Sequence, residues 1–207
     1  MDKDNNRHKE DSFVDFCNKL GSDKPVPGGG AASGIVLSLA ASCAEKAARF
    51  SIDNYLEHYL NSFIEIKEKG FILAENDQKA FLNWMQARKL PKDTESEKKE
   101  REEKIEKYVK ESASVPLEIA KNCIKLVEII LDFIPYCNKW LVSDLATAVA
   151  FACASFESSL FNIRINIPYI KDNDFILSLK LFIEENEKYF QKIVKNSLRS
   201  CNKKIVG

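Results

Sequence analysis

The stretch GGGAASGIVLSLAASCAEKAARF, residues 28–50, decides the fold of this 207-residue chain. Its three glycines close the loop GSDKPVPGGG, residues 21–30, which has the Pro and Gly content of a turn. The residues that follow are small or apolar almost all the way round a helix. A surface helix would carry a charged face, so the sequence predicts a central, buried helix over about Gly30–Phe50.

A second helix of the same character is predicted over about Ser143–Asn166. Its segment LATAVAFACASF, residues 145–156, again combines small and apolar side chains. Small side chains let two helix axes approach closely. We therefore expect these two helices to pack against each other at the centre of the protein.

Helical spacing of apolar residues also predicts the outer elements. They cover about residues 11–20, 54–90, 94–134 and 174–202. The helix from residue 94 starts at a capping box, Thr94 to Glu97, contains Pro116, which should kink it, and ends at Pro135. The fold class is therefore all-α: a single-domain bundle of about six helices over residues 1–207, with residues 1–10 expected to be flexible.

Composition argues against several functional classes. Lys plus Arg and Asp plus Glu both number 31, so the net charge is zero and gives no electrostatic case for nucleic acid or an anionic membrane surface. The N-terminus lacks a signal sequence and no uninterrupted apolar run reaches about 18 residues, so we expect no membrane span and a cytoplasmic location. Six cysteines without a CxxC pair predict reduced, mostly buried thiols. Two histidines argue against a metal site.

Asp77 is the most informative candidate for chemistry. On the predicted helix 54–90 it falls in line with Leu73, Ala74, Phe81 and Trp84, at spacings of three and four. A carboxylate on an apolar stripe is desolvated, which raises its pKa toward the range useful for proton transfer. The alternative is a carboxylate at the edge of the helix with a neighbouring lysine.

The other polar candidates each have a structural alternative. Asp144, the one charge in LVSDLATAVAFACASF, either caps its helix or belongs to a site. Asn162 and Asn166 share a helix face, and their amides can bind a polar ligand or cross-link helices. The N–H groups after Gly28–Gly30 can face an anion, although a plain turn is the commoner reason for such a run.

Six motifs occur in an order that is known from one family. They are PVPGGGAAS (25–33), DQKAF (77–81), ARKLPKDT (87–94), VPLEIA (115–120), N-x-x-x-x-SDLATA (138–148) and N-x-R-I-N (162–166). Over about residues 10–190 the chain thus resembles the formiminotransferase-cyclodeaminase family, which includes methenyltetrahydrofolate cyclohydrolases. The resemblance implies a helical domain that forms a homodimer and binds a tetrahydrofolate derivative near the subunit boundary. It leaves open whether a separate formiminotransferase is a partner.

Two reactions are implied. The cyclodeaminase closes 5-formiminotetrahydrofolate to 5,10-methenyltetrahydrofolate and releases ammonia, and the cyclohydrolase interconverts 5,10-methenyltetrahydrofolate and 10-formyltetrahydrofolate. Neither needs a metal or a redox cofactor. The resemblance makes Asp77 the general acid/base, with Asp144 as the second catalytic candidate. The residues expected to bind substrate are Gly28, Gly29, Gly30, Lys92, Asn138, Ser143, Asn162 and Asn166.

The chain also departs from the family pattern. Ala31 stands where serine is usual, and residues 51–55 read SIDNY instead of a basic cluster. Glu45 and Lys46 replace residues that are normally apolar, and Cys137 replaces the glycine before Asn138. These departures motivate an alternative function: a catalytically degraded helical dimer that binds a ligand or a partner protein.

Overall fold

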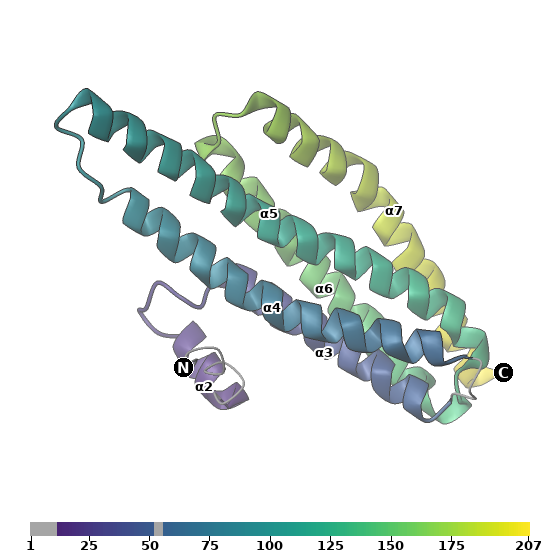
Figure 1. Cartoon of the computed structure of the whole chain (residues 1–207). Helices are drawn as coiled ribbons and strands as arrows, with labels where there is room; N and C mark the ends of the chain where they lie inside the picture. The colour runs from purple at the N-terminus through teal and green to yellow at the C-terminus, as the bar shows by residue number, and fades with distance from the viewer. Residues whose placement is uncertain (1–11, 52–55) are drawn as a thin grey trace.

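The computed structural model describes residues 12–51 and 56–207, and these residues form helices and no strand, as predicted. The α-helices are α2 (Phe13–Leu20), α3 (Gly29–Arg49), α4 (Glu57–Ala87), α5 (Glu95–Phe133), α6 (Val142–Asn166) and α7 (Asn173–Val206). Short 3₁₀ helices, η2 (Ile134–Tyr136), η3 (Lys139–Leu141) and η4 (Ile167–Tyr169), lie around α6. Figure 1 shows α3 to α7 as one elongated bundle.

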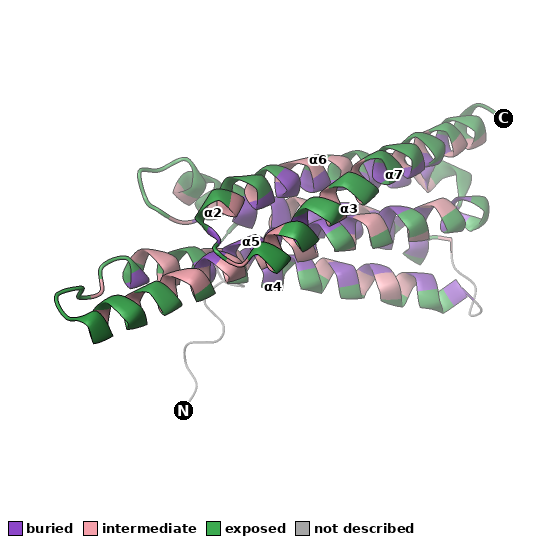
Figure 2. Cartoon of the chain, turned by 90° about the horizontal axis from the view of Figure 1, so that it is seen from above, coloured by how far each residue is buried: buried purple, intermediate pink, exposed green. Residues whose placement is uncertain are grey.

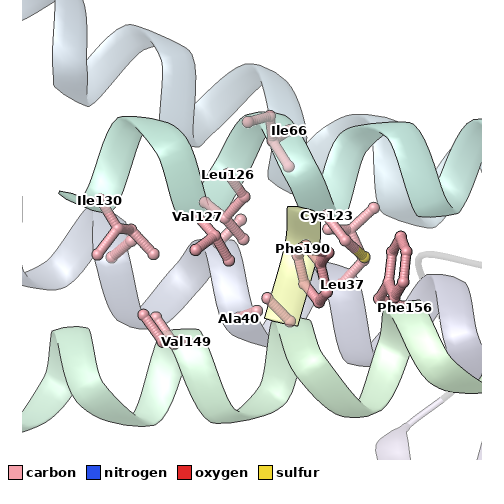
Figure 3. Close-up of a cluster of buried hydrophobic side chains, with 14 of the residues drawn as sticks. Leu37, Ala40, Ile66, Cys123, Leu126, Val127, Ile130, Val149, Phe156 and Phe190 are labelled. Carbon is pink, nitrogen blue, oxygen red and sulfur yellow. The ribbon is translucent and has the colours of Figure 1, made fainter. Parts of the chain in front are cut away.

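The centre of the bundle is apolar and is built by five helices. Leu37 from α3, Ile66 from α4 and Leu126 from α5 are fully or almost fully buried together. Phe156 of α6 stacks on Phe190 of α7 with ring centroids 4.0 Å apart. Figure 3 shows these side chains gathered in one cluster, to which α3, α4, α5, α6 and α7 all contribute.

The predicted close packing of the two small-residue helices, α3 and α6, is confirmed. Hydroxyl groups join them: Ser155 Oγ donates to the Ser33 carbonyl at 2.8 Å, and Ser33 Oγ lies 2.7 Å from Ser158 Oγ. The stretch Lys139–Tyr169, which contains α6, is long and apolar enough to cross a membrane by composition alone. The same composition suits a core helix, and α6 packs against α3, α5 and α7.

The tightest helix contact, however, joins α3 to α4. A Cβ atom at Gly34 would lie 2.8 Å from both the Ala74 backbone nitrogen and the Gly70 carbonyl oxygen. A Cβ atom at Gly70 would lie 2.8 Å from the Gly34 carbonyl oxygen. Two helix backbones therefore touch directly, which is sterically possible only because both positions lack a side chain. Ser38 Oγ donates to the Lys67 carbonyl at 2.8 Å one turn further along.

Helix α5 runs through Pro116 without interruption. Proline has no N–H, so the carbonyl of Ser112, four residues earlier, loses its helical partner. Asn166 Nδ2, at the end of α6, donates to this carbonyl at 3.2 Å. A side chain from a neighbouring helix thus satisfies the acceptor that Pro116 leaves open, and the N-x-R-I-N motif contacts α5 one turn before Pro116.

Two elements project from the bundle. The end of α4 and the start of α5 extend as an antiparallel arm, and α2 lies apart from the main helices (Figure 1). None of the residues of α2 is buried, and Figure 2 shows the arm and α2 largely exposed. The predicted flexibility of residues 1–10 lies outside the described residues.

The predicted helix ends agree with the observed ones to within a few residues. The capping box is present, since Glu97 N–H donates to Thr94 Oγ1 and Thr94 N–H donates to Glu97 Oε2. Helix α4 ends at Ala87 rather than at residue 90, and α7 continues to Val206. The predicted start of α4 at residue 54 lies outside the described residues.

Substitution of Gly70 by alanine should destabilise the protein. Alanine gains up to about 1 kcal/mol over glycine in a helix interior, but forced overpacking costs about 1–3 kcal/mol and sometimes more. Urea unfolding should therefore show a lower free energy of unfolding for Gly70→Ala. Gly21→Ala is the matched control, because its new Cβ would meet only the Cys17 carbonyl oxygen at an ordinary 3.5 Å. Equal or higher stability of Gly70→Ala would contradict the backbone contact.

Candidate functional site

Asp77 of α4 lies against the first turn of α3. A Cβ atom at Gly30 would overlap the Asp77 carboxyl group, so a larger residue there would displace this carboxyl group from its position. The cap residue Gly28 has no side chain to accept the first N–H groups of α3. Asp77 accepts a hydrogen bond from the Ala31 N–H instead. A carboxyl group from another helix thus caps α3, where the helix dipole also favours negative charge.

The surroundings of Asp77 oppose its ionisation. Burial raises its pKa to about 6, and the hydrogen bond from the Ala31 N–H acts in the opposite direction without cancelling the effect. Leu73 and Ala74, one turn earlier, are buried, as the apolar stripe predicts. A carboxyl group with a pKa near 6 exchanges its proton close to neutral pH, which suits a general acid or base.

Asn162 of α6 joins this site from the other side. A Cβ atom at Gly29 would lie 3.6 Å from Asn162 Nδ2, so the side chain contacts the glycine-rich turn. Its Nδ2 donates to the Ser158 carbonyl at 2.8 Å, which fixes the orientation of the amide. The structure therefore brings Asp77, the Gly28–Gly30 turn and Asn162 together.

Asn166, one turn beyond Asn162, has a structural role in this chain. Its Nδ2 donates to the Asn162 carbonyl at 2.8 Å and to the Ser112 carbonyl at 3.2 Å. Asn166 therefore cross-links two helices, which is the structural alternative to binding a polar ligand. Asn166 holds the end of α6 against α5 and thereby supports the position of Asn162.

Asp144, Ser143 and Asn138 lie at the opposite end of the bundle. Eighteen residues of α6 separate Asp144 from Asn162, which is about 27 Å at 1.5 Å per residue. Asp144 does not cap α6: the N-cap is Leu141 without a side-chain cap, and Asp144 pairs with Lys46 Nζ at 3.2 Å. Asn138 caps η3, with Oδ1 accepting from the Trp140 N–H at 3.1 Å. Within one chain these residues do not meet Asp77.

Near that end, one departure from the family pattern, Glu45, has a physical consequence. Glu45 is buried and pairs with Lys67 at 2.8 Å and Arg49 at 2.6 Å. Burial raises the pKa of Glu45, but hydrogen bonds from Lys67 and Arg49 outweigh it and hold the pKa below its usual range. Lys67 of α4 thereby compensates the charge introduced into α3. The departures at residues 52–55 lie outside the described part of the chain.

Lys92 lies in the exposed loop at the tip of the α4–α5 arm. Asp77 is ten residues from Ala87, the last residue of α4, which is about 15 Å along the helix before the tip begins. The structure therefore does not place Lys92 at the Asp77 site.

Sequence reasoning missed two groups near the site. Ser33 and Ser158 form a hydrogen bond between α3 and α6. The sequence pattern had indicated only that these helices carry small side chains. Trp84, on the same stripe as Asp77, has a buried indole N–H without a hydrogen-bond partner among the described residues. The sequence did contain a signal for Trp84, because it places a tryptophan on an apolar stripe. The single N–H donor of a buried tryptophan usually finds an acceptor.

The site combines a proton-exchanging carboxyl group, a helix N-terminus open to close approach and a fixed amide. This set can bind a polar heterocycle and move protons on it. Among residues 12–51 and 56–207, no group of three or more His, Cys, Asp or Glu side chains is arranged to hold a metal ion.

Comparison with known proteins agrees with this architecture. Residues 12–185 match the formiminotransferase-cyclodeaminase family. The chain is 28% identical over 169 residues to the methenyltetrahydrofolate cyclohydrolase of Methylorubrum extorquens, covering 77% of this chain and 81% of that protein. It is 24% identical over 172 residues to the mouse formimidoyltransferase-cyclodeaminase, covering 79% of this chain and 32% of that protein. The chain thus matches about one third of the length of the mouse protein.

A solved structure shows the same fold. The formiminotetrahydrofolate cyclodeaminase of Thermotoga maritima superposes with a TM-score of 0.78 at 27% identity, covering 94% of this chain and 98% of that one. The described residues are thus those of a helical protein whose relatives are cyclodeaminases and cyclohydrolases of folate one-carbon metabolism. The chain belongs to the formiminotransferase-cyclodeaminase family.

Asp77→Asn should stabilise the folded protein at neutral pH. The pKa of Asp77 is about 6 when folded and near 3.8 when unfolded, so the folded state binds the proton more tightly. Ionisation therefore costs stability as pH rises from 4 to 6, and the full cost remains above pH 6. Asparagine removes this cost, about 1–3 kcal/mol after allowance for partial exposure.

Urea unfolding at pH 4.5, 6 and 7.5 measures this difference. The advantage of Asp77→Asn over the wild type should be largest at pH 7.5 and shrink toward pH 4.5. A variant that is less stable at pH 7.5 would show that the ionised carboxylate stabilises the helix terminus, against the sign argued here.

Proposed function

We propose that the protein is a folate one-carbon enzyme, either a formiminotetrahydrofolate cyclodeaminase or a methenyltetrahydrofolate cyclohydrolase, with Asp77 as the general acid/base. The observation that carries the proposal is the contact of the Asp77 carboxyl group with Gly30 at the N-terminus of α3, together with a pKa of about 6. The named activities of the relatives support the substrate class.

Both reactions act on the one-carbon unit between two folate nitrogens. In the cyclodeaminase direction, protonated Asp77 assists the departure of ammonia and, once ionised, accepts the proton lost from the attacking nitrogen. In the cyclohydrolase direction, Asp77 takes a proton from water. Because one group must both give and take a proton, a pKa near neutrality serves both halves of the reaction. The proposal includes a cytoplasmic location and no metal or redox cofactor.

We also propose that a homodimer completes the site. Exposed apolar side chains lie along α3 and α6: Leu39 is 39%, Phe151 38% and Phe161 66% exposed. Such surfaces commonly mark interfaces. These two helices run from the Asp77 end of the bundle to the Asp144 end. A two-fold axis across them would place Asp144, Asn138 and Ser143 of one copy near Asp77 of its partner, which explains how residues of one site can lie far apart in one chain.

The decisive experiment follows the absorbance of 5,10-methenyltetrahydrofolate with purified protein. The assay starts in turn from that compound and from 5-formiminotetrahydrofolate. Loss of absorbance in the first case identifies a cyclohydrolase, and gain in the second identifies a cyclodeaminase. Absence of both, with retained folate binding, would favour the alternative of a degraded dimer. A separate formiminotransferase partner is tested by adding a purified formiminotransferase to the second assay.

Asp77→Asn should reduce turnover about 10²–10⁴-fold, the usual contribution of a positioned proton-transfer group. Asparagine keeps the shape and removes the titration, so folate affinity and the oligomeric state should remain close to those of the wild type. Turnover and binding are measured on the same preparation. Full activity would exclude Asp77 as the catalyst and leave Asp144 as the next candidate.

The dimer should be visible by light scattering at micromolar concentration. Phe151→Glu places a charge on the α3–α6 face and should give a monomer with little activity. Leu181→Glu is the matched control, because Leu181 is 45% exposed but lies on α7. A monomeric wild type, or a Phe151→Glu variant that stays dimeric, would count against an interface on this face.

A further inference from the structure

One buried hydrogen-bond donor near the candidate site has no acceptor among the described residues. The Trp84 indole Nε1 is buried and, within the described residues, has no hydrogen-bond partner. An unsatisfied buried donor costs about 1–3 kcal/mol, so such a group requires an explanation.

The surroundings of Trp84 suit a negatively charged ligand group. The Arg88 guanidinium lies over the Trp84 ring, 4.7 Å from its centroid. Within the described chain Arg88 makes no ion pair, and Arg101 donates to its backbone carbonyl at 3.2 and 3.3 Å. Tyr169 packs edge-on against Trp84 with centroids 6.1 Å apart. A neutral donor, two cations and an aromatic edge therefore lie together.

This cluster is continuous with the candidate active site. Trp84 is seven residues after Asp77, two helical turns along the same face of α4, or about 10 Å. Arg88 follows one turn later. A ligand whose reacting centre lies at Asp77 and whose body follows α4 toward the arm reaches Trp84 and Arg88 well before the exposed loop that carries Lys92.

We propose that Trp84 and Arg88 form a subsite for a carboxylate of the substrate, the one on the glutamyl tail of the tetrahydrofolate derivative. The inference rests on the proposed function and goes beyond it by naming the residues that hold the tail. Indole N–H and guanidinium groups both donate to carboxylate oxygens, and a donor paired with a cation is the usual means of binding one. Arg88 and Tyr169, which both contact the Trp84 ring, have exposed side chains that can rotate away from it.

The test replaces the indole N–H without changing its shape. Benzothienylalanine, which has sulfur in place of the N–H, is introduced at position 84, and Trp84→Phe serves as the genetically simple version. Calorimetric titration compares 5-formyltetrahydrofolate with its analogue that lacks the glutamate. Loss of a hydrogen bond to a charged group should weaken binding of the complete ligand about 10- to 100-fold. Binding of the tail-free analogue should stay unchanged. Arg88→Gln should show the same selectivity.

The free protein supplies an independent readout. Because the N–H has no partner to lose, the thermal midpoint of the benzothienylalanine protein should equal or exceed that of the wild type. A lower midpoint, or a weaker dimer with unchanged ligand binding, would assign the N–H a structural partner and overturn the subsite. Equal weakening of both ligands would place the contact elsewhere on the folate.

The two proposals fail in distinguishable ways. If the wild type binds the complete ligand and the variants bind it equally well, the subsite is wrong while the proposed function stands. If the wild type binds neither ligand, the proposed function fails and the subsite fails with it.

Discussion

The direct contact of two helix backbones at Gly34 and Gly70 is the constraint on which the candidate site depends. Helices α3 and α4 run antiparallel, so contact at this pair fixes which residues meet further along the two helices. With this register, Gly30, which is four residues before Gly34, meets Asp77, which is seven residues after Gly70. The catalytic candidate is therefore positioned by a contact made outside the site. A side chain at either glycine would separate the helices and withdraw the carboxyl group from the helix terminus.

Asp77 has two physical roles that compete. As the cap of α3 it accepts the Ala31 N–H, and an ionised carboxylate would do this better. As a partly buried group it is held closer to the neutral form, because burial penalises the charge more than the cap rewards it. The result is a carboxyl group that changes state near neutral pH, at a cost in stability that a purely structural cap would not carry. Functional sites commonly show such a cost.

The chain compensates its irregular features with neighbours from other helices. Pro116 leaves the Ser112 carbonyl without a helical partner, and Asn166 supplies one. Glu45 brings a charge into α3, and Lys67 of α4 pairs with it. Trp84 stands out against this pattern, because its indole N–H is compensated by no described residue. That contrast is the reason to assign it to a ligand rather than to the architecture.

The sequence by itself determined the helical fold and the two small-residue helices at its centre, and it made Asp77 a candidate, because apolar periodicity and a carboxylate on an apolar stripe are local patterns. It placed Asp144 and Asn162 on one helix, about 27 Å apart, but it could not reveal which of the two lies at the end of the bundle that carries Asp77. Motif order along the chain carries no information about which end of an antiparallel helix a residue occupies. The pairing of Asn166 with the carbonyl freed by Pro116, and of Gly30 with Asp77, was decided only by tertiary packing. Both contacts depend on the register between helices, which is set by side chains and glycines far from the residues that meet.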